Sequence, residues 1–350
     1  MDKKLLVIAS SSIHTYNFIN LVKDGFNEIT LITDKANEQS PISTYQLDFS
    51  FGLHLFKTLS RLRTICNTFK PSIIHIHQAN SYAFYTLLAL KSLGIPIVLT
   101  AWGSDILVNP KKNILLKKLV QYILSHVDAL TADSYYVLNS AQELIEKRLN
   151  SHNINFGIDP IECTLPKENM IYSNRLHKKL YNIDKILISF SKFHNNHSDW
   201  VLIIAGEGDE TAYLEQLASW LGILNHVKFI GFVDRETNYS YYCRSKIYVS
   251  VPGSDSVSLS LVESIICDCI PFVSDLPANH ELITDGLNGF LEQDLEDINF
   301  NRFEMIDQKI LNTKKSDIKR LFSKDYNRQL YFNLYQKLLK PEPLTPYEGK

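Results

Sequence analysis

Short apolar runs alternate along the chain with longer segments of helical spacing. The runs are rich in β-branched residues and bounded by turn formers, which is typical of buried strands. In the first half they are Leu5–Ala9, Ile29–Thr33, Ile73–His77, Ile97–Ala101 and Ala129–Ala132. Between Ile114 and Ile123 the apolar residues follow one helical face, and Lys117 and Lys118 follow the other. This alternation predicts a parallel sheet covered by helices on both sides.

The pattern stops near residues 153–166, which are rich in turn formers, and then starts again. The second series of expected strands is Met170–Ser173, Val201–Ala205, Val227–Ile230, Ile247–Val251 and Pro271–Ser274. We therefore expect an α/β protein of two doubly wound, Rossmann-like domains, residues 1–156 and 157–324, facing a central cleft. An amphipathic C-terminal helix, at about residues 325–350, is expected to pack back on the first domain. Ligands of open α/β sheets bind beyond the carboxyl ends of the strands, so the cleft is the expected active site.

The composition narrows the class of protein. A length of 350 residues suits two domains, and a net charge of −2 argues against a nucleic-acid partner. The five cysteines are scattered, which favours reduced thiols over a disulfide framework. Cys267-x-Cys269 lacks the spacing of a zinc site, so no metal is expected. The chain start lacks the long apolar core of a signal peptide, and no run of about 18 apolar residues occurs. A cytoplasmic location is expected.

The strongest chemical signal lies between Pro252 and Asp275. A strand ends near Val251, a polar loop follows, and a short apolar helix carries Glu263. Loop amides ahead of a helix N-terminus favour an anion such as a diphosphate. A carboxylate in that helix can accept two hydrogen bonds from a ribose diol. The alternative is a polar loop followed by a solvated glutamate.

This segment resembles family 4 of the retaining, two-domain (GT-B) glycosyltransferases, particularly bacterial polysaccharide enzymes. Their hallmark is two acidic residues with the separation of Asp255 and Glu263, then a helix, a Pro-started strand and a stretch like Glu281–Gly289. The resemblance implies that Glu263 binds the donor ribose and that Asp255 lies beside the transferred sugar. The family usually has Glu where Asp255 stands. Asp268 occupies a position where a glycine commonly ends the helix, and Asp tolerates that left-handed conformation.

The resemblance extends to the other loops of the second half. Gly206–Asp209 looks like the family's glycine turn, and Val227–Val233 looks like the strand and loop that hold the nucleotide base. Arg175 matches a diphosphate-binding arginine. The family's lysine is replaced by Leu180, so Lys179 or its neighbour Lys178 is the expected substitute. The implied donor contacts are Glu263, Arg175, Lys179, Gly206, Phe232, Val233 and the amides of Ser256, Val257, Ser258 and Leu259.

In the first half, residues 74–82 and 98–107 resemble the acceptor-side loops of the same enzymes. His77 and Asp105 are candidates for orienting the acceptor hydroxyl and join Asp255 as the expected catalytic residues. A histidine at a strand end is, in the alternative, purely structural. The implied acceptor-side residues are His14, Asn80, Trp102, Gly103 and Ser104, and many relatives carry His at the position of Trp102.

Two segments combine cations with leucine- and isoleucine-rich faces, Pro110–Leu124 and Lys57–Lys70. Surfaces of this kind lie on anionic bilayers. The alternative is a pair of sheet-covering helices with charged outer faces. We expect a peripheral location at the inner face of the cell membrane.

The expected activity follows from the resemblance. It implies retaining transfer of a hexose or N-acetylhexosamine from a UDP- or GDP-linked sugar to a glycan, such as an undecaprenyl-diphosphate-linked oligosaccharide of O-antigen or capsule synthesis. No cofactor is expected, and the absence of an Asp-x-Asp pair agrees with metal-independent transfer. The alternatives are a nucleotide-sugar epimerase of the same architecture and a non-enzymatic sugar-binding protein. A dinucleotide oxidoreductase is disfavoured because no Gly-x-Gly-x-x-Gly follows a strand.

Overall fold

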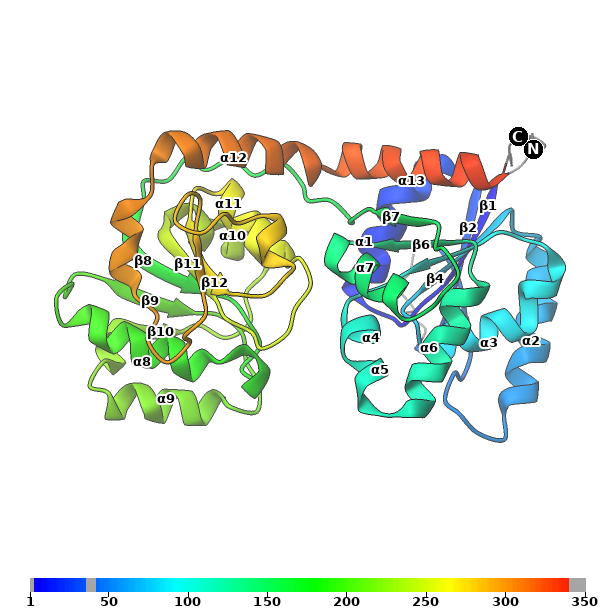
Figure 1. The fold of residues 1–350 in the computed structure, drawn as a ribbon, viewed down its shortest axis with the longest axis horizontal. Helices are drawn as coiled ribbons and strands as arrows, with labels where there is room; N and C mark the ends of the chain where they lie inside the picture. The colour runs from blue at the N-terminus through cyan, green and yellow to red at the C-terminus, as the bar shows by residue number, and fades with distance from the viewer. Residues whose placement is uncertain (1–2, 36–41, 340–350) are drawn as a thin grey trace, which may run out of the picture. The chain divides into compact units, whose positions relative to one another are not determined.

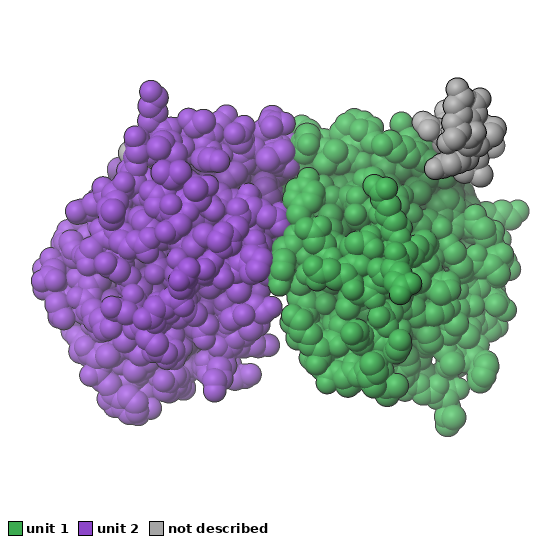
Figure 2. All heavy atoms as spheres, in the orientation of Figure 1, with its two compact units in different colours: residues 1–157, 324–350 green, residues 158–323 purple. Residues whose placement is uncertain are grey.

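The computed structural model describes residues 3–35 and 42–339. The chain forms two compact units, unit 1 from residues 1–157 and 324–350 and unit 2 from residues 158–323 (Figure 2). The chain enters unit 2 after Gly157 and returns to unit 1 at Lys324. Each unit is an α/β fold built on its own parallel sheet (Figure 1).

Unit 1 contains a seven-stranded sheet of order β3-β2-β1-β4-β5-β6-β7, and every paired strand is parallel. The strands are β1 (Lys4–Ile8), β2 (Glu28–Thr33), β3 (Ser43–Gln46), β4 (Ile73–His77), β5 (Ile97–Thr100), β6 (Ala129–Ala132) and β7 (Ser151–Asn153). The five strands predicted from the sequence are confirmed. The edge strands β3 and β7 were missed because their residues are mostly exposed and lack an apolar pattern.

Helices cover both faces of this sheet. They are α1 (Ile13–Val22), α2 (Leu55–Phe69), α3 (Ser81–Leu90), α4 (Ser104–Leu107), α5 (Asn109–Lys112), α6 (Ile114–His126), α7 (Tyr135–Glu143) and α13 (Lys324–Leu339). Successive residues of β1 point to opposite faces, so Leu6 joins the core under α2, α3 and α6, and Leu5 joins the core under α1 and α13.

Helix α13 packs on unit 1, where the hydroxyl of Tyr335 lies 2.7 Å from Nδ1 of His75 and Nε of Arg328 donates to the carbonyl of Leu21. The expected continuation of this helix, residues 340–350, lies outside the described residues.

Unit 2 contains a six-stranded parallel sheet of order β10-β9-β8-β11-β12-β13. Its strands are β8 (Glu168–Ser173), β9 (Val201–Ile204), β10 (Val227–Phe229), β11 (Ser245–Ser250), β12 (Ile270–Ser274) and β13 (Phe290–Glu292). Its helices are α8 (Ile183–His194), α9 (Thr211–Trp220), α10 (Arg235–Arg244), α11 (Leu259–Ile266) and α12 (Gln308–Leu321). The loops after β8, β9, β10 and β11 therefore share one edge of the sheet, where a ligand of an open α/β sheet binds.

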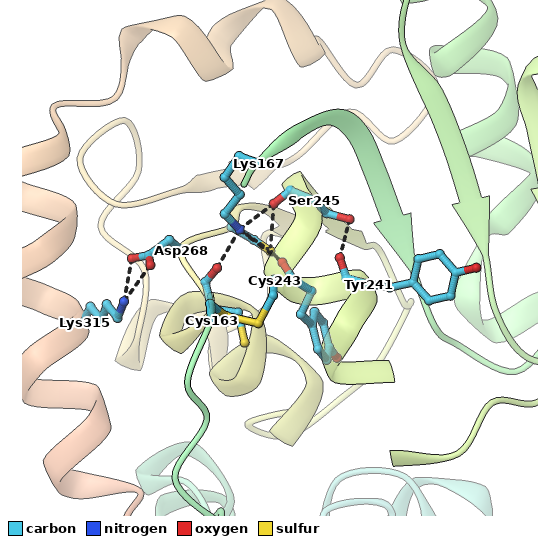
Figure 3. Close-up of a disulfide and its surroundings, with 10 residues drawn as sticks. Cys163, Lys167, Tyr241, Cys243, Ser245, Asp268 and Lys315 are labelled. Atoms are coloured by element: carbon cyan, nitrogen blue, oxygen red, sulfur yellow. Dashed lines mark hydrogen bonds and ion pairs between the residues drawn. A yellow bond between two sulfur atoms is a disulfide. The ribbon is translucent and has the colours of Figure 1, made fainter. Parts of the chain in front are cut away.

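The expectation that all five cysteines are reduced thiols is wrong. Cys163 and Cys243 form a disulfide (Figure 3). Cys66, Cys267 and Cys269 are free and buried. The two bonded residues are 80 positions apart. Their pairing depends on how α10 packs against the segment that precedes β8, and cysteine spacing does not reveal that contact.

None of the helices in the described part of the chain has the length and apolar character needed to cross a bilayer.

Candidate functional site

Two glycines bring the loops after β8 and β9 into backbone contact. Gly206 has a φ of 105°, and a Cβ added there would lie 2.6 Å from the carbonyl oxygen of Arg175. A Cβ at Gly208 would collide with the carbonyl oxygen of His177. The amide of Gly206 also donates to the carbonyl of Gly231, which follows β10. Only glycine fits this close approach, so Gly206–Asp209 forms a turn that holds the two loops together.

An open pocket of about 720 Å³ lies over this turn. Its walls come from the loops after β8, β9 and β10 and from the start of α9. Phe232 is exposed at its edge, and Lys178 lines it. Lys179, the expected site lysine, is not among the lining residues, nor is Val233. The geometry therefore favours Lys178 over Lys179 as the cation of this pocket.

Arg175 and Asp255 form an ion pair at the same edge of the sheet. Nη2 of Arg175 lies 2.7 Å from Oδ2 of Asp255, and Nη1 donates to the hydroxyl of Ser258 at 2.8 Å. The guanidinium also lies over the ring of Tyr181, 4.6 Å from its centroid. Burial works against the charge of Arg175, but the Asp255 carboxylate together with Tyr248 and Tyr181 outweighs it, so the Arg175 pKa is raised. The loop after β8 is thereby tied to the loop after β11.

The start of α11 has an unusual cap. Ser258 is the N-cap residue, but its side chain makes no capping hydrogen bond and instead accepts one from Arg175. The amide of Ser256 donates to Oδ1 of Asp255, and the side chain of Val257 is buried. Backbone N–H groups at a helix start that lacks a side-chain cap favour an anionic ligand.

Glu263 lies one turn into α11 and is half-buried. The hydroxyl of Tyr239, on α10, donates to its Oε1 at 3.2 Å and accepts from Nε of Arg235 at 2.9 Å. Arg235 in turn forms an ion pair with Asp159. Burial raises the pKa of Glu263 to about 7, and the hydrogen bond from Tyr239 opposes that rise. A small change in its surroundings therefore changes its charge near neutral pH.

Asp268, after α11, adopts the left-handed conformation expected of it, with a φ of 61°. Both of its carboxylate oxygens accept from Nζ of Lys315, at 2.7 Å.

In unit 1, Asp105 joins the two expected acceptor loops. It is buried, and its carboxylate accepts the amide hydrogens of Ala79 at 2.7 Å and Trp102 at 3.0 Å. Burial raises its pKa, and these backbone hydrogen bonds oppose the rise. A carboxylate that accepts from both backbone segments holds the two loops in place, and the expected catalytic role of Asp105 stays a prediction. Gly103, with a φ of 92°, makes the turn between Trp102 and the exposed Ser104.

His77 is enclosed by aromatic rings. It is 1% exposed, and its ring stacks on Phe156 and contacts the edges of Phe18 and Trp102. Neither ring nitrogen has a hydrogen-bond partner among the described residues. Burial, with a smaller effect from His14, lowers its pKa to about 3. The ring is thus neutral and shielded by these aromatic residues, and its expected role in orienting an acceptor hydroxyl stays a prediction.

Two of the other acceptor-side residues differ in access. His14 is exposed and lies edge-on to Trp102, with 5.3 Å between the ring centroids. Asn80 caps α3, where its side chain accepts the amide of Tyr82. His14 is therefore the more accessible of the histidines predicted from the sequence.

Both proposed membrane segments have an inner and an outer face. On α6, Val120, Ile123 and Leu124 are buried in the core, whereas Ile114 and Leu115 are 64% and 78% exposed. Their neighbours Lys111, Lys112, Lys117 and Lys118 are also exposed. Just before the other segment, Phe51, Leu53 and Phe56 are exposed, and Phe56 lies in the first turn of α2. Each helix both covers the sheet and presents apolar side chains to solvent.

Comparison with known proteins assigns both units to one kind of enzyme. Residues 3–134 match the family model described as Glycosyl transferase 4-like, and residues 163–302 match Glycosyl transferases group 1. Together these matches cover well over half of the chain, in the order of the two sheets. The chain belongs to the GT-B glycosyltransferases.

Individual relatives of this glycosyltransferase are distant. An N-acetyl-α-D-glucosaminyl L-malate synthase of Bacillus anthracis is 26% identical over 66% of this chain and 64% of that protein. An uncharacterized glycosyltransferase of Haemophilus influenzae is 25% identical over 87% of this chain and 89% of that protein. The solved structure of Anabaena Alr3699/HepE with UDP and glucose has a TM-score of 0.76 at 14% identity and covers 95% of this chain and 100% of that one. That structure shares the GT-B fold.

Sequence reasoning missed the partners of Glu263. Tyr239 and Arg235 lie four residues apart on α10, which is a helical spacing, but nothing in the sequence indicates that this face meets α11. It also missed the pairing of Arg175 with Asp255, because the two residues are separated by 80 positions.

Proposed function

We propose that this glycosyltransferase binds a nucleoside diphosphate sugar along the loop edge of unit 2. The observation that supports this most is the arrangement around α11. Arg175 and Asp255 meet at its uncapped start, Glu263 follows one turn later, and the pocket at Gly206 adjoins Arg175 through its backbone. Arg175 and Asp255 suit the diphosphate and the sugar of a sugar nucleotide. Glu263 suits its ribose, and the pocket suits its base.

Each part has a chemically suitable partner. The diphosphate takes the amides of residues 256–259 with Arg175 and Lys178, the ribose diol donates to Glu263, and the base lies against Phe232. We propose UDP over GDP as the carrier, because the structurally similar Anabaena protein was solved with UDP and glucose. The transferred group is a hexose or N-acetylhexosamine.

The proposed reaction retains the anomeric configuration and uses no metal. Negative charge grows on the leaving diphosphate as the bond to the sugar breaks. Arg175 and the start of α11 are fixed in place to stabilise that charge. An incoming diphosphate competes with Asp255 for Arg175. Asp255 is then free to orient the donor sugar and to favour the positive charge that develops on it.

The proposed acceptor is a lipid-linked glycan, such as an undecaprenyl-diphosphate-linked oligosaccharide of O-antigen or capsule synthesis. This proposal rests on Ile114 and Leu115, which lie exposed beside four lysines on α5 and α6. Such a surface binds anionic lipid through both charge and apolar contact. We propose that the enzyme works at the inner, cytoplasmic face of the membrane.

A panel of nucleotide sugars tests the donor proposal. A ligand at 100 times its Kd stabilises the folded protein by about 2.7 kcal/mol, which a thermal unfolding scan detects. We expect one UDP or GDP sugar to do so, and Glu263→Ala to abolish the shift. Incubation of that donor without acceptor then separates the alternatives, since an epimerase converts it to a second sugar nucleotide. An absence of stabilisation by every sugar nucleotide contradicts the proposal.

Vesicle sedimentation tests the membrane proposal. The protein should partition onto phosphatidylglycerol vesicles more than onto phosphatidylcholine vesicles, and Ile114→Ser with Leu115→Ser should reduce that binding. Leu224→Ser is a matched control, because Leu224 is an exposed leucine of unit 2. If the control and the double variant bind phosphatidylglycerol vesicles equally, this surface is not the membrane-binding site.

A further inference from the structure

Three cysteine sulfurs from three different elements meet in unit 2. Cys163 lies on the segment that leads into β8, Cys243 near the end of α10, and Cys267 directly after α11. The three sulfur atoms all lie within 4.8 Å of one another. Cys163 and Cys243 form the disulfide, and Cys267 is a buried free thiol beside it. A thiol this close to a disulfide is an internal nucleophile for it.

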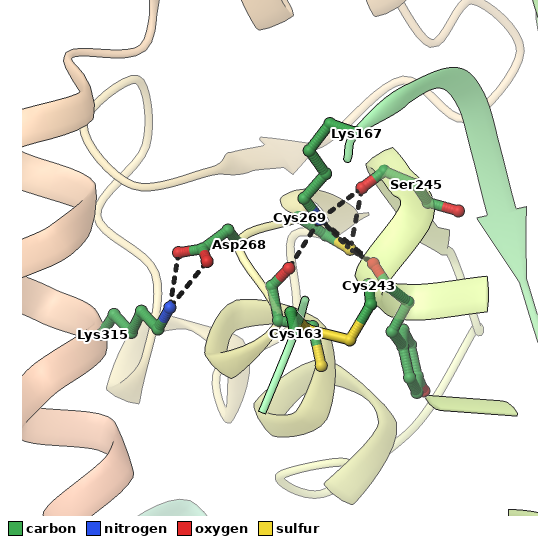
Figure 4. A network of polar contacts seen from close by, with 9 residues as sticks. Cys163, Lys167, Cys243, Ser245, Asp268, Cys269 and Lys315 are labelled. Carbon is green, nitrogen blue, oxygen red and sulfur yellow. Dashed lines mark hydrogen bonds and ion pairs between the residues drawn. A yellow bond between two sulfur atoms is a disulfide. The ribbon is translucent and has the colours of Figure 1, made fainter. Parts of the chain in front are cut away.

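Lys167 holds the same three elements together without sulfur. Its Nζ donates to the carbonyl oxygens of Tyr242 at 3.1 Å, Ser245 at 2.6 Å and Cys267 at 2.6 Å (Figure 4). The ion pair of Asp159 with Arg235 attaches the same leading segment to the other end of α10. Opening the disulfide therefore leaves the sulfurs close to one another, and a new bond between any two of them requires little chain movement.

We infer that Cys163, Cys243 and Cys267 form a thiol–disulfide exchange site in which Cys243 alternates between two disulfide partners. The Cys267 thiolate attacks Sγ of Cys243, a Cys243–Cys267 bond forms, and the Cys163–Cys243 bond breaks. Cys163 leaves as a thiolate and takes up the proton that Cys267 lost. No net oxidation or reduction occurs. Two equivalents of a small thiol such as glutathione reduce either disulfide, giving two cysteine thiols and one glutathione disulfide.

The other groups near Cys267 set its resting state. Burial raises the pKa of the Cys267 thiol, Cys269 and Glu263 add to the rise, and Lys167 and Lys315 oppose it. Cys267 therefore rests as a thiol, and Cys163–Cys243 is the resting disulfide. Cys269 is not one of the three exchanging cysteines, because its thiol contacts Nζ of Lys167 and the carbonyl oxygens of Tyr242 and Ser245.

The exchange changes what α10 is attached to. The Cys163–Cys243 bond ties α10 to the segment before β8, whereas a Cys243–Cys267 bond ties it to the end of α11. Helix α10 carries Tyr239, and the amide of Cys267 donates to the carbonyl of Glu263 at 2.9 Å. The second disulfide thus joins the two helices that hold the Tyr239–Glu263 contact. In this respect the inference rests on the proposed donor role of Glu263, but the exchange itself does not.

Disulfide mapping of Cys163→Ser tests the exchange without any nucleotide. The variant is equilibrated in a mixture of oxidised and reduced glutathione, quenched with acid, alkylated and digested for mass spectrometry. We expect a Cys243–Cys267 peptide, which Cys163→Ser with Cys267→Ser lacks. Cys66→Ser, which alters a buried cysteine of unit 1, should retain Cys163–Cys243 as its main disulfide. Recovery of Cys243 and Cys267 as alkylated thiols under conditions that oxidise Cys163–Cys243 in the wild type overturns the inference.

The wild-type protein provides a second test if Cys163→Ser does not fold. A substoichiometric amount of dithiothreitol at alkaline pH starts exchange, and trapped samples are mapped over time. Global unfolding is monitored by far-UV circular dichroism. Appearance of the Cys243–Cys267 peptide before unfolding supports the exchange site. Its absence throughout contradicts it. Neither result depends on whether the protein binds a sugar nucleotide.

Discussion

Arg175 and Asp255 form an ion pair in unit 2. Their side chains meet at 2.7 Å, although they follow different strands of unit 2, and Ser258 accepts from the same guanidinium. The pair holds the cation proposed for the diphosphate and the carboxylate proposed for the sugar in one place. Each charge neutralises the other, so the pair avoids the cost of an unpaired, largely buried ion.

This pairing predicts opposite effects of two substitutions on nucleotide binding. Hydrogen bonds to a charged group contribute about 1.5–3 kcal/mol, so Arg175→Ala should weaken UDP binding about 10- to 150-fold. Asp255→Asn removes the competing anion, so UDP should bind at least as tightly as to the wild type while sugar transfer falls. Isothermal titration and an initial-rate assay check both outcomes. Weaker UDP binding by Asp255→Asn would show that Asp255 does not compete for Arg175.

Glu263 predicts that donor binding depends on pH near neutrality. Its pKa of about 7 arises mainly from burial, and only the ionised carboxylate accepts both hydrogen bonds of a ribose diol. The protein must release a proton to bind below this pKa, so affinity for a UDP-sugar should fall by up to about tenfold per pH unit as the pH drops from 7. Above pH 7 the affinity for the UDP-sugar should no longer change with pH.

Two variants check the assignment of this pH dependence. Glu263→Gln should bind weakly with a flat profile. Tyr239→Phe removes a hydrogen bond that favours the ionised form, so its midpoint should move to higher pH. Titrations of a UDP-sugar between pH 5.5 and 8.5, about 1.5 units on either side of the Glu263 midpoint, give the profiles. A wild-type profile shared by Glu263→Gln would assign the dependence to another group.

Gly206 should tolerate no side chain, unlike a comparable glycine. Both Gly206 and Gly222 have positive φ values, 105° and 72°, so alanine is strained at each. At Gly206 the added Cβ also meets the carbonyl of Arg175, whereas at Gly222 nothing lies within 4 Å. We expect Gly206→Ala to lower the melting temperature more than Gly222→Ala and, alone of the two, to weaken UDP binding. If both variants lost the same amount of thermal stability and UDP affinity, the loops after β8 and β9 would be able to adjust to a side chain at Gly206.

Asp105 should be needed for stability more than for chemistry. In Asp105→Asn an amide nitrogen replaces one oxygen and faces the N–H of Ala79 or Trp102, which should cost about 1–3 kcal/mol of unfolding free energy. Urea unfolding measures this loss, and UDP binding should be unchanged. A variant of wild-type stability that has lost turnover would instead support the catalytic role expected for Asp105.

Local patterns were sufficient to predict much of the fold. Strands such as Lys4–Ile8 are buried on both faces and their apolar residues are therefore consecutive, whereas the exposed edge strand Ser43–Gln46 carries no such pattern. The left-handed Asp268 was also predictable, because its position at a helix end restricts the backbone.

The contacts of the candidate site were less predictable, because they depend on packing between distant segments. The resemblance to family 4 glycosyltransferases suggested Asp255, Glu263 and Gly206, which stand near turns and helix starts. It did not show that Arg175 pairs with Asp255, that Tyr239 reaches Glu263, or that His77 is enclosed by aromatic rings. The Cys163–Cys243 bond was missed for the same reason.

A crystal structure of the protein with UDP tests the central claim most directly. We predict that the ribose hydroxyls lie within hydrogen-bond distance of the Glu263 carboxylate and that the diphosphate lies at the start of α11 beside Arg175. Well-ordered UDP bound elsewhere, with Glu263 still in contact only with its protein neighbours, would contradict the account.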